Sequence, residues 1–219
     1  MAILLMRHME SEKNINRTFS SISNEECLTT KGKKDCYIIA ETINEFVTKN
    51  NLNVKNIYSA NSIRARTTAS VIAEKLGLSV MAFDELCSNK SGELLGKSEA
   101  EANKINPLFI KQLTLFRAGL FSSYDFVKVY RREDKHEFEK KVSTCIERIT
   151  LNDKGDLQIF VLHHSSLTAI MINYARKFYN YPSNFYGHVA CDLGNVYLIN
   201  NDEIVLCNEP PEKLLSIEL

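Results

Sequence analysis

The chain has 219 residues, 44% of them hydrophobic, and its 27 basic and 27 acidic side chains give a formal net charge of zero. This length and apolar content suit one α/β domain with a sizeable core. The balanced charge provides no overall field that would attract nucleic acid or an anionic membrane, so we expect neither partner, and any affinity for anions must be local.

The first predicted element is a buried strand over residues 2–7. Its continuous apolar run ends abruptly at Arg7 and His8. In an open α/β sheet, ligands bind at the edge where the parallel strands end, so these two side chains are candidates for a site. The polar residues from 12 to 30 show neither a helical nor a strand period, which predicts a loop.

Helix and strand patterns alternate after this loop. Apolar residues at helical spacing predict a helix from about Lys31 to Lys49, and a short strand follows at 56–59. Ser62 can cap a second helix, which Gly77 ends, and residues 79–82 form a third strand. This order predicts parallel strands with right-handed crossovers, and therefore a three-layer α/β/α sandwich around a mostly parallel sheet.

The segment from 84 to 136 is the least regular part of the chain. Residues 84–104 resemble a loop, Pro107 opens a predicted helix with one apolar face, and residues 122–136 could be a strand or an insertion. We expect a variable lid or insertion here, within a single domain over residues 1–219, and we expect it to determine the substrate. Its aromatic side chains could wall a substrate pocket or merely cover the sheet.

The second half of the chain contains another strand that ends at histidines. The apolar run over residues 157–162 leads directly into His163 and His164. If this strand is parallel to the first, His8 and His163 reach the same edge of the sheet. Two such strands are stronger evidence for a site than one, because a single histidine after a strand is usually a packing or surface residue.

The remaining elements complete an α/β pattern. Helices are predicted from about Glu137 to Ile149 and from Ser166 to Phe178, each with one apolar side. Residues 195–199 and 204–206, joined by a polar turn, predict a closing hairpin, and the tail with its two prolines is expected to be irregular.

Six cysteines are scattered along the chain, and none has the CxxC or Cys/His spacing of a zinc site. They are typical of reduced thiols in a cytosolic protein. The N-terminal apolar run is too short and wrongly flanked for a signal peptide, and no later segment could span a bilayer. We therefore expect a cytoplasmic protein without a metal site.

Four blocks of the sequence, spread from residue 2 to about 172, follow one order. They are Arg7-His8-Met9-Glu10-Ser11 with Asn14, Leu28-Thr29 with Lys31-Gly32, Ser59 with Arg64-Ala65-Arg66-Thr67-Thr68-Ala69, and Val161-Leu162-His163 with Leu167. Together they resemble the motifs of the histidine phosphatase superfamily, whose members include phosphoglycerate mutases and many phosphatases. The resemblance implies a phosphoglycerate mutase-like fold.

The resemblance also assigns roles to the residues in these blocks. It makes His8 the nucleophile that accepts the phosphoryl group, and it places Arg7, Arg64 and His163 in a clamp around the phosphate oxygens. The chemistry agrees, because a neutral imidazole can attack phosphorus and guanidinium groups donate paired hydrogen bonds to phosphate. Asn14 would add an amide donor.

Two residues depart from the family pattern beside the histidines. Met9 and His164 each stand where the family usually has glycine, so the backbone at these points is less permissive. The side chain of His164 either narrows the phosphate pocket or points away from it. We include His164 among the candidate phosphate-binding residues.

The family's usual proton donor has no counterpart in the sequence. Ser88 occupies the position where a glutamate is expected, and Glu85 and Glu93 are the nearest replacements. A general acid speeds the departure of an alkoxide, so both glutamates are catalytic candidates; the alternative is that both are solvated loop residues. The family includes members that lack this acid and cleave bonds with better leaving groups, such as phosphohistidine.

The resemblance implies a metal-independent phosphatase that uses no cofactor and hydrolyses a phosphomonoester or a phosphoramidate through phosphohistidine on His8. The substrate would be a phosphorylated small molecule or a phosphoprotein, and exposed aromatic residues could pair two copies in a homodimer. A mutase-type phosphotransferase is an alternative, but mutases of this family tend to carry longer lids and the acid. A weakened phosphate-binding or scaffold protein is the other alternative.

Overall fold

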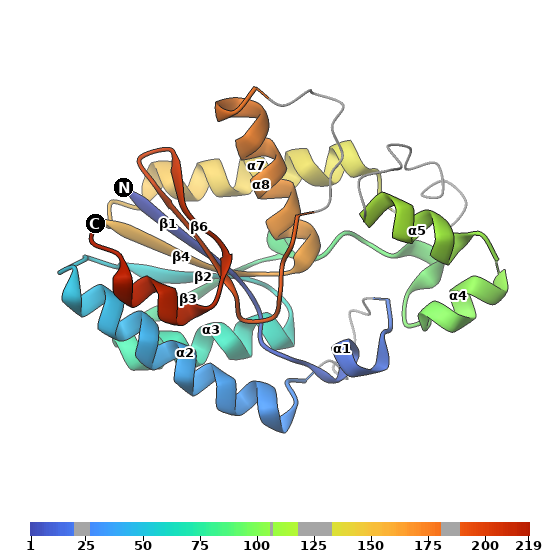
Figure 1. The fold of residues 1–219 in the computed structure, drawn as a ribbon, viewed down its shortest axis with the longest axis horizontal. Coiled ribbons are helices and arrows are strands. Elements are labelled where there is room, and N and C mark those ends of the chain that lie inside the picture. Colours follow the sequence, from blue (N-terminus) through green and yellow to red (C-terminus); the bar gives the residue numbers. More distant parts are fainter. Residues whose placement is uncertain (20–26, 106, 118–132, 181–188) are drawn as a thin grey trace.

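A six-stranded sheet forms the centre of the computed structural model, which describes residues 1–19, 27–105, 107–117, 133–180 and 189–219 (Figure 1). The strand order is β3-β2-β4-β1-β5-β6. Strands β1 to β4 are parallel to one another, β5 is antiparallel to β1, and β6 is antiparallel to β5. The bounds are β1 Ala2–Arg7, β2 Asn56–Ala60, β3 Ser79–Phe83, β4 Leu157–Leu162, β5 Val196–Asn200 and β6 Glu203–Glu209.

Helices cover both faces of this sheet. Helices α2 and α3 lie on one face, and α7 and α8 lie on the other, which confirms the predicted three-layer arrangement and mostly parallel sheet (Figure 1). The helices are α1 Glu12–Asn16, α2 Thr30–Lys49, α3 Ile63–Leu76, α4 Glu99–Ile105, α5 Phe109–Arg117, α7 Lys135–Asn152 and α8 His164–Phe178. None of the helices in these described ranges is both long and apolar enough to span a bilayer.

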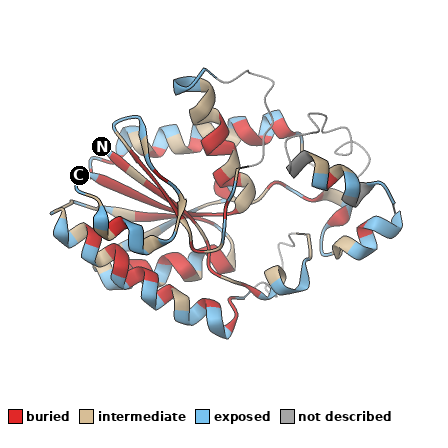
Figure 2. Cartoon of the chain, viewed as in Figure 1, coloured by how far each residue is buried: buried red, intermediate tan, exposed pale blue. Residues whose placement is uncertain are grey.

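Strand β4 lies between β1 and β2, although it follows both in the sequence. Every residue of β4 is buried, as expected for a parallel strand covered on both faces (Figure 2). Its register pairs Leu162 with Arg7, the last residue of β1. The backbone NH of His8 also donates to the carbonyl of Leu162 at 3.0 Å. The two strands therefore release His8 and His163 at the same edge of the sheet.

Three segments have more regular structure than the sequence predicts. The expected loop over residues 12–30 contains α1, and the loop-like stretch from 84 to 104 contains α4 and two short 3-10 helices. The tail forms a further 3-10 helix, Pro211–Ser216. Helix α1 is short enough to escape a periodicity test, yet its capping box of Ser11 and Asn14 is visible in the sequence. Of residues 122–136, for which the sequence predicts either a strand or an insertion, 122–132 lie outside the described residues, and Lys135 begins α7.

Gly32 brings the beginning of α2 into contact with the loop that follows β1. A Cβ atom at this position would lie 2.1 Å from the carbonyl oxygen of Glu10, a backbone atom that cannot turn aside. The two segments are also joined by hydrogen bonds from Thr29, whose NH donates to the Glu10 carbonyl and whose hydroxyl donates to the Glu10 carboxylate. This contact fixes the loop that carries His8.

We expect Gly32→Ala to lower the free energy of unfolding by about 3 kcal/mol, because the added methyl group forces α2 away from this loop. Urea denaturation measures the change. Lys34→Ala, an exposed substitution on the same helix, is the control and should stay within about 0.5 kcal/mol of wild type. Equal free energies of unfolding for the two variants would show that the close approach of Gly32 to Glu10 does not stabilise the fold.

Candidate active site

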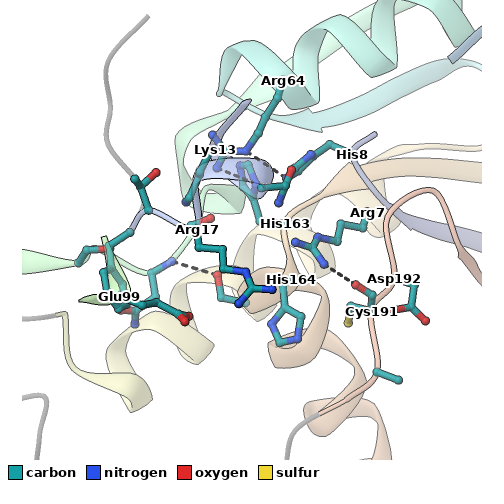
Figure 3. Close-up of a pocket in the computed structure, with 18 residues that line it drawn as sticks. Arg7, His8, Lys13, Arg17, Arg64, Glu99, His163, His164, Cys191 and Asp192 are labelled. Carbon is teal, nitrogen blue, oxygen red and sulfur yellow. Dashed lines mark hydrogen bonds between the residues drawn. The ribbon is translucent and has the colours of Figure 1, made fainter. Parts of the chain in front are cut away.

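Two buried histidines form the centre of the site (Figure 3). His8 follows β1 and His163 follows β4, and their ring centroids lie 5.0 Å apart in an edge-to-face arrangement. The predicted convergence of these two side chains is therefore observed. Since both rings are almost fully buried, any charge they carry must be balanced by a ligand or by other side chains.

Hydrogen bonds assign the proton on His8. Its Nδ1 atom lies 2.7 Å from the carbonyl oxygen of Met9, and a carbonyl only accepts, so Nδ1 carries the hydrogen. The other nitrogen, Nε2, accepts a hydrogen bond from Nε of Arg64 at 3.0 Å. Burial, followed by the charges of Arg64 and Arg7, holds the pKa of His8 well below its usual value. His8 is therefore neutral near pH 7, with the lone pair of Nε2 turned into the site.

His163 has the opposite tautomer. Its Nδ1 accepts from Nη2 of Arg64 at 3.2 Å, which leaves Nε2 to donate to the hydroxyl of Ser62 at 3.0 Å. Burial is the largest cause of a pKa well below the usual value, followed by the charges of Arg64 and His8. Ser62 also caps α3, because its hydroxyl accepts from the backbone NH of Ala65.

Arg64 lies between the two histidines and is buried on the first turn of α3. Burial is the main cause that lowers the pKa of Arg64, to about 10, so the guanidinium stays charged at neutral pH. Thr68 joins this turn to the loop after β1, since its hydroxyl donates to the Arg64 carbonyl and accepts from the backbone NH of Met9. Arg66, two residues further along the same helix, is exposed.

Arg7 reaches the site from the end of β1. Its Nη1 donates to the carbonyl oxygen of Cys191 at 2.7 Å, which holds the guanidinium at the side of the cavity opposite Arg64 (Figure 3). Cys191 itself is buried, and burial raises the pKa of its thiol to about 12, so the thiol is neutral. The two arginines thus approach the histidines from different elements.

A cavity of about 560 Å³ opens beside these groups. Six predicted residues line it: Arg7, His8, Asn14, Arg64, His163 and His164. Asn14 caps α1 with its side-chain oxygen, which accepts from the backbone NH and the hydroxyl of Ser11, so only its NH₂ group can donate to a ligand. His164, the first residue of α8, faces the cavity rather than the interior of the fold (Figure 3).

The structure does not bring the two candidate glutamates to this cavity. Glu85 accepts a hydrogen bond from Arg148 on α7 at 3.2 Å, and Glu93 is exposed. Neither is among the described residues that line the cavity, because the short helices around them turn their side chains toward α7 and toward solvent. Ser88 lines the cavity, as does Glu99 at the start of α4.

Lys13 is a cavity residue that the sequence analysis missed. It lies on α1, and burial, followed by the charges of Arg64 and Arg7, lowers the pKa of its amine to about 6. When the amine is protonated, its positive charge contributes to lowering the pKa of both histidines. The capping pattern of Ser11 and Asn14 could have predicted the helix that turns Lys13 inward.

Met9 takes the place of a glycine without backbone strain. It is not among the described non-glycine residues with positive φ. Its backbone NH and carbonyl are both bound, to Thr68 and His8, and its buried side chain packs against Gly194. A Cβ atom at Gly194 would lie 2.9 Å from the Met9 sulfur, so the absence of a side chain there makes room for Met9.

Over the described ranges, no cluster of three or more histidine, cysteine, aspartate or glutamate side chains is arranged to hold a metal ion. The cavity lining near the histidines consists instead of donors and cations: Arg7, Arg64, Lys13 and Asn14. Such a set can neutralise and orient a tetrahedral oxyanion.

The two lowered histidine pKa values predict a loss of stability in acid. In the unfolded chain each imidazole binds a proton near pH 6.5, whereas in the folded protein each resists protonation beside Arg64. The unfolded state therefore gains protons first as the pH falls below about 6.5, and the free energy of unfolding declines by up to about 1.4 kcal/mol per pH unit for each histidine.

Urea denaturation between pH 7.5 and pH 5 measures this decline. His163→Asn, which cannot titrate, should have a shallower pH dependence than wild type over the same range. Equal slopes in the two proteins would contradict the lowered pKa of His163.

Comparison with known proteins identifies the family to which these motifs belong. A family model described as the histidine phosphatase superfamily (branch 1) matches residues 3–203. The chain is 23% identical over 166 residues to a 2,3-bisphosphoglycerate-dependent phosphoglycerate mutase of Thermoplasma acidophilum, covering 76% of this chain and 72% of that protein. It is 28% identical over 167 residues to phosphoglycerate mutase-like protein 4 of Arabidopsis thaliana, covering 74% of this chain and 65% of that protein.

Solved structures share the fold over almost the whole chain. A mycobacterial glucosyl-3-phosphoglycerate phosphatase has a TM-score of 0.73 at 13% identity, covering 94% of this chain and 98% of that one. The α-ribazole phosphatase of Shigella flexneri has a TM-score of 0.70 at 17% identity, covering 95% of this chain and 96% of that one. At such identities the likeness extends to the fold alone.

Proposed function

The chain belongs to the histidine phosphatase superfamily, branch 1, and on this premise we propose that it is a metal-independent phosphatase that hydrolyses a phosphomonoester or a phosphoramidate through phosphohistidine on His8. Its substrate is a phosphorylated small molecule or a phosphoprotein. The observation that carries the proposal is the tautomer of His8, in which Met9 binds the Nδ1 hydrogen and leaves Nε2 as the nucleophilic atom beside Arg64.

The first step transfers the phosphoryl group to the enzyme. Nε2 of His8 attacks phosphorus while the bond to the leaving oxygen or nitrogen breaks, and Nδ1–H of His8 keeps its hydrogen bond to Met9, which supports the positive charge that develops on the ring. Arg7 and Arg64 neutralise the equatorial oxygens, because the transition state spreads negative charge over them. His163 donates to the same oxygens through its Nε2–H, which in the ligand-free site is bound to the hydroxyl of Ser62.

The second step hydrolyses phosphohistidine. Water attacks phosphorus, the N–P bond breaks, and inorganic phosphate leaves the clamp. Asn14 and His164 line the cavity and act as further donors to the phosphate. Each of these groups belongs to the protein itself, so the proposed route needs neither a metal nor an organic cofactor.

Mutase-type phosphotransfer is the second candidate, because both sequence relatives carry phosphoglycerate mutase in their names. The two reactions share phosphohistidine and differ in its fate, since a mutase must return the phosphoryl group to a second hydroxyl instead of to water. Ser88 stands at the position of the usual acid, which favours hydrolysis of substrates whose leaving group departs easily without protonation.

Phosphate release from p-nitrophenyl phosphate tests the proposal, because its leaving group needs little protonation. We expect turnover that a metal chelator does not reduce. A parallel assay supplies 3-phosphoglycerate with its bisphosphate cofactor and follows formation of 2-phosphoglycerate. Formation of 2-phosphoglycerate faster than phosphate release would show that the protein is a mutase and not a phosphatase. Binding of inorganic phosphate without turnover of either substrate would identify a phosphate-binding protein.

A further inference from the structure

The proposed reaction requires a proton for the leaving oxygen, and the residues where the family places its donor cannot supply it. Ser88 lines the cavity but carries a weakly acidic hydroxyl. Glu85 is bound to Arg148 and Glu93 is exposed, and both lie outside the cavity lining. The donor must therefore come from another element.

Among the residues that the structure describes, two other carboxylates line the cavity, and both lie away from the histidines. Glu99 lies on the far side, beside Arg17, and is not among the groups that shift the pKa of either histidine (Figure 3). Asp192 is exposed near Arg7, and its carboxylate accepts from the side chain of Asn208 at 2.9 Å. Asp192 is therefore on the solvent-exposed side of the cavity, and Glu99 is on the side away from the histidines.

Lys13 is closer to the chemistry than either carboxylate. Its side chain lies beside Arg64 and the two histidines, and it acts on the pKa of both rings (Figure 3). Helix α1 fixes its position, because the helix is capped by Ser11 and Asn14 and its first NH, from Glu12, donates to the carbonyl of Cys27 at 3.0 Å. The amine therefore approaches the phosphoryl pocket from the cavity side.

We propose that Lys13 is the proton donor to the leaving group, a role that rests on the proposed phosphatase function. In the first step the His8 Nε2–P bond forms and the P–O bond to the leaving group breaks, while an N–H bond of the Lys13 ammonium breaks and an O–H bond forms on the departing oxygen. In the second step a water O–P bond forms and the N–P bond breaks, and the proton of the attacking water returns to the Lys13 amine.

The electrostatics of the pocket suit this cycle. With a pKa of about 6, the amine is largely neutral in the ligand-free site, where Arg64 and Arg7 repel a further positive charge. A phosphoryl dianion bound between the arginines reverses that repulsion, so Lys13 takes up a proton as substrate binds. A group whose pKa moves through the neutral range can both give and accept a proton, as the two steps require.

The test compares two esters whose leaving groups differ in their need for a proton. Rates are measured with p-nitrophenyl phosphate and with phenyl phosphate for wild type, Lys13→Met, Lys13→Arg and the exposed control Lys33→Met on α2. We expect Lys13→Met and Lys13→Arg to lower kcat for phenyl phosphate by about 100-fold and for p-nitrophenyl phosphate by less than about 10-fold. Lys33→Met should match wild type.

Lys13→Arg separates proton donation from charge, because a guanidinium keeps the charge and holds its proton. An equal loss on both esters in Lys13→Met, or recovery of both rates in Lys13→Arg, would overturn the role and leave Lys13 as a phosphate ligand. Lys13→Met should fold, since it removes a positive charge beside two guanidinium groups. Wild-type protein that hydrolyses neither ester would contradict the phosphatase function itself, and the proton donor with it.

Discussion

Replacing His8 by alanine is expected to lower kcat/KM for p-nitrophenyl phosphate by about 10⁴-fold or more. The loss is large because the variant has no atom at the position of Nε2, and the neighbouring His163 does not replace it, because its Nε2 donates to Ser62 and its Nδ1 accepts from Arg64. Phosphate release under saturating and limiting substrate measures the change.

The matched control is His136→Ala, which removes an exposed histidine on α7 and should retain wild-type rates. Thermal unfolding of both variants verifies that they are folded. A His8→Ala protein that keeps more than a tenth of wild-type activity would show that phosphoryl transfer does not pass through this residue.

Replacing Arg64 by methionine is expected to lower kcat/KM by about 10³-fold, because the guanidinium is the buried cation shared by both histidines and the candidate phosphate site. Arg64→Lys should recover little, since one ammonium group cannot make the paired contacts of a guanidinium fork. Inorganic phosphate should also bind more weakly to Arg64→Met, which isothermal titration calorimetry measures.

A second readout separates this role from a general loss of structure. The charge of Arg64 lowers the pKa of His8 and of His163, so its removal should raise both values, as followed by NMR titration of the imidazole signals. Arg66→Met, an exposed substitution on the same helix, should change neither activity nor these pKa values. Unchanged histidine pKa values in Arg64→Met would contradict the geometry of the site.

Much of the site follows from where the sequence places its strands. His8 and His163 each come directly after a run of apolar residues, and parallel strands must end at one edge, so their convergence was predictable. Strand order was not, because nothing in the local pattern of residues 157–162 says that β4 inserts between β1 and β2. That both histidines lie at one edge of the sheet follows from the parallel strands alone. That their ring centroids lie 5.0 Å apart depends on the strand order, in which β4 is next to β1.

The proton donor was harder to predict, because it depends on segments without a regular period. Glu85 and Glu93 were chosen for their closeness in sequence to Ser88, and the turns between them decide which way each carboxylate points. Lys13 was overlooked because a lysine in a polar stretch is usually solvated. Only the short helix α1, with its capping residues Ser11 and Asn14, turns that side chain into the cavity.

Trapping of the enzyme during turnover tests the central claim most directly. The protein is mixed with p-nitrophenyl phosphate, quenched in base within a few milliseconds, digested, and examined by mass spectrometry for a peptide that has gained one phosphoryl group. We predict this modification on His8, and its absence in His8→Ala. A phosphoryl group on any other residue, or turnover without any phosphorylated peptide, would contradict attack by His8.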